Sequence, residues 1–123
     1  MDMITAYAQA KENDTAEMLG WRLIDGEAKI GETLAPSKIW TLAANGGEYE
    51  QTNENADGTS VFSDLKDMLE YAKYSAKGFT LALVGGDRGR IDDNQELLAG
   101  ERIVRDAVVL ATWTRNSSNE EWR

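Results

Sequence analysis

Apolar and polar positions between residues 63 and 84 describe an amphipathic helix followed by a buried strand. Apolar residues recur at spacings of four, three and four, at Leu65, Leu69, Ala72 and Ala76, which places them on one helical face. Ser63 is a suitable N-cap, and Gly78 is a suitable left-handed terminator. The pattern therefore predicts a main helix over residues 63–77, packed on the sheet that holds the apolar segment 79–84.

Most of the remaining chain consists of β-like segments separated by turn signals. Strand composition is found at residues 38–44, 48–53, 59–62 and 101–114. Asn45-Gly46-Gly47 supplies the positive φ angles of a tight hairpin between the first two segments. The last segment turns apolar on both faces in its middle, which predicts a central strand.

The N-terminal pattern is weaker. Residues 3–10 fit both the helical and the strand period because most of them are small. Asp14 and Glu17 have the spacing of a capping box, which favours a short helix over residues 15–24. A strand over residues 18–24 is the competing interpretation. A short N-terminal helix is therefore expected beside the main one.

Three further segments are predicted to be irregular. Residues 85–89, Gly-Gly-Asp-Arg-Gly, are expected to form a loop, and residues 94–99 a single helical turn. Residues 115–123 are expected to form a polar, frayed tail. Together the elements predict one α+β domain over residues 1–114. It has two layers, a mixed and mostly antiparallel sheet of about four or five strands, and helices on one face.

Composition restricts the chemistry. The 123 residues include no cysteine and no histidine, which excludes disulfides, thiolate metal sites, cysteine nucleophiles and the Ser-His-Asp triad. Catalysis is disfavoured, because only carboxylates, Lys, Tyr, Ser and Thr remain for it. The N-terminus lacks the regions of a signal peptide, and no apolar run has membrane-spanning length. We therefore expect a cytoplasmic protein that does not associate with a membrane.

Charge is distributed unevenly. The formal net charge is −9, and residues 1–62 carry 11 acidic and 4 basic side chains. Residues 39–65 contain no Lys or Arg. Such a charge disfavours direct binding to nucleic acid or to an anionic membrane. It favours a protein partner with a basic surface, and the predicted contact residues are Glu48, Glu50, Glu54 and Asp57.

The first functional hypothesis follows from that segment. Carboxylates without intervening cations can imitate the phosphates of a nucleic acid and dock in the basic groove of a nucleic-acid-binding protein. Small inhibitors encoded by viruses and mobile elements use this strategy against cellular defence nucleases. The competing interpretation is that the charge only keeps the protein soluble. This first hypothesis describes a small, non-catalytic interaction protein.

Two alternatives belong to other classes. A small-ligand-binding domain, or an enzyme without histidine, would have a pocket near Tyr71, Tyr74 and Arg88, with Arg90 as a further anion-binding residue. The glycines of segment 85–89 match neither a dinucleotide fingerprint nor a phosphate-binding P-loop. A structural subunit would instead assemble with copies of itself through an exposed sheet edge.

Residues 53–64 partly match the oxygen spacing of an EF-hand calcium loop. The match fails at the two most informative positions, because Asn53 replaces the first aspartate and Asp64 replaces the bidentate glutamate. A turn at residues 57–58 explains the same composition. We therefore expect neither a metal nor a cofactor.

Overall fold

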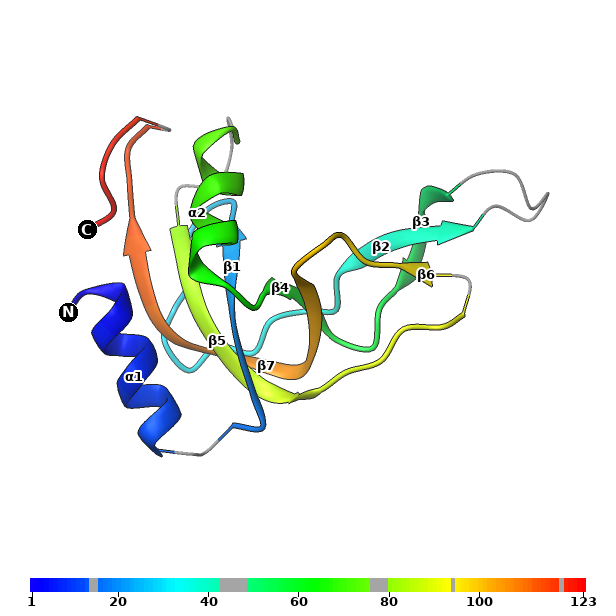
Figure 1. The fold of residues 1–123 in the computed structure, drawn as a ribbon, viewed down its shortest axis with the longest axis horizontal. Coiled ribbons are helices and arrows are strands. Elements are labelled where there is room, and N and C mark those ends of the chain that lie inside the picture. Colours follow the sequence, from blue (N-terminus) through cyan, green and yellow to red (C-terminus); the bar gives the residue numbers. More distant parts are fainter. Residues whose placement is uncertain (14–15, 43–48, 76–79, 94, 118) are drawn as a thin grey trace.

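The computed structural model describes residues 1–13, 16–42, 49–75, 80–93, 95–117 and 119–123 (Figure 1). Its helices are α1 (Met3–Asn13) and α2 (Leu65–Lys73). Its strands are β1 (Met18–Ile24), β2 (Lys38–Leu42), β3 (Tyr49–Asn55), β4 (Thr59–Phe62), β5 (Thr80–Arg88), β6 (Gln95–Glu96) and β7 (Glu101–Thr114).

The strands form two antiparallel sheets. One has the order β1–β4–β7–β5, and it closes on itself because β5 pairs back with β1. The contact that joins β1 to β4 is the single pair Trp21–Phe62. The second sheet has the order β3–β2–β6, and it projects away from the two helices (Figure 1). The predicted α+β class is confirmed, and every pairing described is antiparallel.

The core lies on both sides of β5. One cluster of buried side chains packs with the helices and consists of Ala6, Trp21, Met68, Ala72, Leu81, Leu83 and Trp113. A second cluster consists of Val61, Ala82, Val84, Val104, Ala107 and Val109. Because Leu81 and Ala82 are consecutive and belong to different clusters, β5 is buried on both faces, as its apolar sequence predicts.

The prediction of a helix over residues 15–24 is wrong. Met18–Ile24 is the strand β1, which pairs with β5 from Met18–Gly86 to Ile24–Thr80. A capping box is a local signal of about 1 kcal/mol. Burying Trp21, which is 1% exposed, and completing the ladder with β5 outweigh it. The helix of this region lies earlier, at α1, where the Thr5 amide donates to Asp2 Oδ1 at 2.8 Å.

The main helix is confirmed, with shifted ends. The N-cap is Asp64, whose Oδ1 accepts from the Lys66 amide at 2.8 Å. Ser63 instead donates its hydroxyl to the Gly100 carbonyl. The helix ends at Lys73, and the predicted stop at Gly78 lies outside the described residues. The predicted hairpin glycines, residues 46–47, also lie outside them.

The predictions for residues 85–89 and 94–99 are also wrong. β5 continues to Arg88. Glycine at position 86 permits this close approach of β5 and β7, because a side chain there would collide with the Arg105 carbonyl on the neighbouring strand. Gln95–Glu96 is the short strand β6, paired with β2. Asp106 has a φ of 54° and lies beside a register shift between β5 and β7. The side chains of β7 therefore do not point strictly alternately to the two faces of the sheet through the middle of the strand.

The end of the chain is ordered against the sheet rather than frayed. Thr114 and Arg123 exchange backbone hydrogen bonds of 3.0 and 2.9 Å. Arg115 is 5% exposed and donates from Nη2 at 2.8 Å to the Ala72 carbonyl, which also accepts from the Ser75 amide at the end of α2. The Trp122 ring covers the guanidinium at 4.5 Å, and burial lowers the pKa of Arg115.

Candidate binding groove

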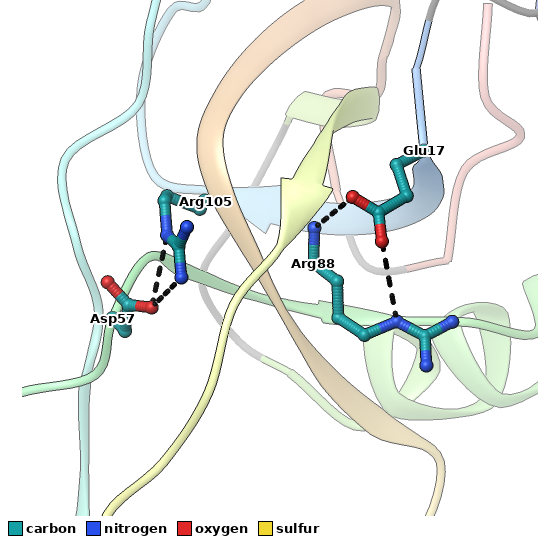
Figure 2. Close-up of polar contacts among 4 residues, drawn as sticks. All are labelled: Glu17, Asp57, Arg88 and Arg105. Carbon is teal, nitrogen blue, oxygen red and sulfur yellow. Dashed lines mark hydrogen bonds and ion pairs between the residues drawn. The ribbon is translucent and has the colours of Figure 1, made fainter.

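Asp57 is the one predicted acidic contact residue whose side chain the structure describes. Glu48 lies outside the described residues, and Glu50 and Glu54 are placed by their backbone in β3. Asp57 Oδ2 accepts from Nη2 and Nε of Arg105 at 2.6 and 3.1 Å (Figure 2). This pairing holds the pKa of Asp57 below its usual range. The Asp57 charge is therefore compensated within the chain.

The two predicted anion-binding arginines also lie beside carboxylates of their own chain. The Arg88 amide donates to Glu17 Oε2 at 3.4 Å, and its Nε lies 4.0 Å from Glu17 Oε1 (Figure 2). Arg90 is exposed, and both its backbone amide and its charge help to lower the pKa of Asp57. Arg88 thus forms an ion pair with Glu17, Arg90 lies near Asp57, and neither arginine lines the pockets found among the described residues.

Tyr71 and Tyr74 lie elsewhere, on a groove of about 960 Å³ bounded by α2, β1, β4 and residues 98–101. They are 51% and 77% exposed, although aromatic side chains usually gain by burial. Neither Arg88 nor Arg90 lines this groove. The structure therefore brings the two predicted tyrosines together and separates them from the predicted arginines.

The groove has an apolar wall supported by the core. Its apolar lining residues are Trp21, Leu23, Phe62, Met68, Tyr71, Tyr74, Leu98 and Ala99. Met68 anchors α2, being 1% exposed, and Phe62 holds the Tyr71 ring at 5.4 Å between centroids. Tyr71 lies in the last turn of α2, and Tyr74 is the C-cap that follows the helix. The C-terminal end of α2 thus presents two aromatic rings to the groove that the half-exposed Leu98 also lines.

A network of polar side chains forms the floor. Ser60 is buried and donates from Oγ to Glu101 Oε2 at 2.5 Å. The other oxygen of that carboxylate, Oε1, accepts from the Leu98 amide at 3.1 Å. Arg22 donates from Nη1 to the Ser60 carbonyl at 3.1 Å. Both oxygens of Glu101 are therefore fixed by its own chain, and β1, β4 and β7 together position the floor.

Arg22 is the cation of the groove. Its side chain is half-buried, and burial lowers its pKa, with Tyr71, Glu101 and Asp25 acting in the opposite direction. Among the described residues no carboxylate oxygen lies within 4.0 Å of its guanidinium, so the charge has no direct ion pair there. The Ser60 carbonyl is its one hydrogen-bond acceptor in this part of the chain.

The lining as a whole is acidic. Among the described residues, its carboxylates are Asp25, Asp67, Glu70 and Glu101, and its cation is Arg22. Asp25, Asp67 and Glu70 are exposed at the rim. Carboxylates beside aromatic faces favour a positively charged, partly apolar ligand, through Coulomb attraction and cation–π contact. The groove is thus suited to binding a cation.

Sequence reasoning missed the polar floor. Arg22, Ser60 and Glu101 are separated by 38 and 41 positions in the chain and belong to no motif. Only pairing of β1 and β7 with β4 brings them together. The tyrosine pair at the C-terminal end of α2 was the one local signal of this site.

The segment resembling a calcium loop, residues 53–64, runs through β3, a turn and β4. Within the described ranges, no three carboxylates converge in the manner of a metal site. In the same part of the chain, neither α1 nor α2 has the length and apolar character of a membrane-spanning helix.

Comparisons of the chain with models of known protein families, with curated proteins and with solved structures find no match.

Proposed function

We propose that this protein is a small, non-catalytic interaction protein that binds a basic surface of a partner protein. The observation that carries the proposal is the groove beside α2, where exposed tyrosines stand among rim carboxylates. Exposed apolar surface rimmed by charge is typical of protein interaction sites. The groove rather than the β2–β3 segment becomes the principal contact site, since Asp57 is already paired with Arg105.

Charge supports this function both during the approach of a partner and at direct contact. The net charge of −9 accelerates encounter with a basic partner, and this steering weakens as salt increases. At contact, a lysine or arginine of the partner gains about 0.5–1 kcal/mol from an exposed aromatic face. The neighbouring carboxylates of Asp67 and Glu70 add charge-assisted hydrogen bonds.

A nucleic-acid-binding protein is one partner class that meets these requirements. Its basic groove is built to receive a row of phosphates, which carboxylates can replace. Inhibition of such a partner, as by anti-defence proteins of viruses and mobile elements, is the form of the proposal that the acidic segment 39–65 favours. In this form, the predicted contact residues Glu48, Glu50 and Glu54 supply a second contact.

The test is titration of the protein with a short synthetic lysine-rich peptide, followed by calorimetry at low and at high salt. We expect the double variant Tyr74→Ala with Glu70→Gln to bind at least about tenfold more weakly than the unmodified protein. The matched control is Glu12→Gln, which removes an exposed carboxylate from α1, outside the groove. Equal weakening by both variants, or none by either, would show that the groove is not the contact site.

A further inference from the structure

Arg22 has unused hydrogen-bonding capacity at the floor of the groove. A guanidinium carries several N–H donors in a rigid planar fork. In the described part of the chain, one of these, on Nη1, reaches an acceptor, the Ser60 carbonyl. Arg22 is one of the residues that line the groove, so its remaining donors are available to an occupant that reaches this side chain.

The carboxylates nearby do not take up these donors. Both Glu101 oxygens are held by the Ser60 hydroxyl and the Leu98 amide. Asp25 is exposed at the rim and forms no ion pair with Arg22 within 4.0 Å. A half-buried guanidinium with unused N–H donors is stabilised most strongly by a carboxylate, because a carboxylate can accept two parallel hydrogen bonds from the planar fork.

The rim restricts which anion can enter. Asp67, Glu70 and Asp25 surround the same opening and repel a multiply charged group such as a phosphate. A single carboxylate is accepted only when a cation on the same ligand compensates the rim. The groove therefore matches a ligand that carries a carboxylate next to a positively charged, partly apolar arm.

Among protein segments, a chain that ends in lysine or arginine has this chemistry. We propose, building on the function proposed above, that the groove binds the C-terminus of a partner chain. Arg22 receives the terminal carboxylate, and the last basic side chain lies along Tyr71 and Tyr74 toward Glu70. Capture of a terminal carboxylate is an established mode of peptide recognition, and here it would add specificity to a contact otherwise based on charge.

The experiment compares two synthetic peptides of identical lysine-rich sequence, one with a free C-terminal carboxylate and one with a C-terminal amide. For the unmodified protein we expect the amide to bind about tenfold to a hundredfold more weakly, since a charge-assisted contact is lost. In the variant Arg22→Gln, the two peptides should bind alike. Arg22→Lys, which keeps the charge without the fork, should restore only part of the difference.

The outcomes separate this inference from the function on which it rests. Equal affinity of both peptides for the unmodified protein overturns terminal recognition and leaves binding of basic segments standing. Absence of binding by either peptide overturns both. Because the two peptides are first compared on the unmodified protein, the result does not depend on the folding of an Arg22 variant. Persistence of the carboxylate preference in a folded Arg22→Gln protein would also exclude Arg22 as its cause.

Discussion

The four-stranded sheet buries β5 between two apolar clusters, whereas the described residues of the three-stranded sheet contribute to one cluster of three buried side chains. In the first, Leu81 and Val84 are completely buried and contribute to opposite clusters. In the second, β2 contributes Ile39 to a group whose other buried members are Ala56 and Ile103. Ile103 belongs to β7, so the smaller sheet depends on the larger one for part of its core.

This difference explains where a binding site can be well defined. The groove lies against the four-stranded sheet, where Met68 and Trp21 fix its walls from beneath. Side chains supported in this way keep their geometry before a ligand arrives, which lowers the entropy lost on binding. The acidic segment 39–65 instead spans most of the three-stranded sheet, where the described residues form one cluster of three buried side chains.

The sharpest test of this comparison is Leu81→Ala. We expect a loss of about 2–5 kcal/mol in the free energy of unfolding, measured by urea denaturation, because the substitution leaves a cavity in the main core. Leu98→Ala is the control, since Leu98 is 53% exposed and its loss should change stability by about 0.5 kcal/mol or less. Similar losses in the two variants would contradict the assignment of the core.

Gly58→Ala tests the connection between the sheets. Gly58 has a φ of 141°, and a Cβ there would collide with the Val104 carbonyl. Its own carbonyl accepts from the Ser37 amide at 2.9 Å, which ties the start of β2 to the start of β4. We expect a loss of about 2–4 kcal/mol. Gly26 also has a positive φ, but no atom lies within 4 Å of the position that a Cβ would take there. Gly26→Ala should therefore lower the free energy of unfolding by less than Gly58→Ala.

Ile39→Ala tests whether the smaller sheet unfolds separately. We expect it to lower global stability by about 2 kcal/mol, at the low end for such substitutions, because the cluster that the described residues form around it is small. Amide hydrogen exchange should accelerate in β2, β3 and β6 and remain slow in β5. Uniform acceleration across both sheets would show that they form one cooperative unit.

Trp122→Ala tests the ordered end of the chain. Removing the ring uncovers the Arg115 guanidinium and part of the main core, and we expect a loss of about 1–2 kcal/mol. The neighbouring substitution Glu121→Ala, at an exposed position, is the matched control. Equal thermal stability of both variants would mean that the tail contributes no packing.

Asp57→Asn has the smallest expected effect and a defined pH dependence. Pairing with Arg105 lowers the pKa of Asp57 in the folded state. Its stabilisation is therefore present above the usual pKa of about 3.9 and is lost as pH falls through the lowered value. The melting temperature of the variant should be slightly reduced at pH 7 and should converge with that of the unmodified protein in acid. Asp93→Asn, also exposed, serves as the control.

Local patterns were reliable where periodicity and burial agree. The apolar stripe of α2, the continuous apolar run of β5 and the two apolar faces of β7 each indicated the element that forms. They failed where long-range pairing competes with a local signal. The segment after Asp14 carries a helix cap and becomes β1, because seven pairs with β5 and the burial of Trp21 outweigh that cap.

The candidate site divides in the same way. The two tyrosines at the C-terminal end of α2 were identifiable as ligand-binding candidates from the sequence, because that helix was itself predictable. Arg22 and Glu101 were not, since each has an ordinary local context and acquires its role only when β4 brings the two strands together. The predicted arginines Arg88 and Arg90 were placed elsewhere by the extension of β5.

The amino-acid sequence by itself determined the α+β class, the principal helix and strands, the acidic charge and the exclusion of cysteine and histidine chemistry. These properties depend on the composition of the chain or on the spacing of residues within one element, and both can be read without knowing which distant residues come into contact. The tertiary structure alone decided that residues 18–24 form a strand, that the chain end folds back on Arg115, and that Arg22 faces a groove. Each of these depends on the free energy of contacts between residues far apart in the chain, which no local pattern records.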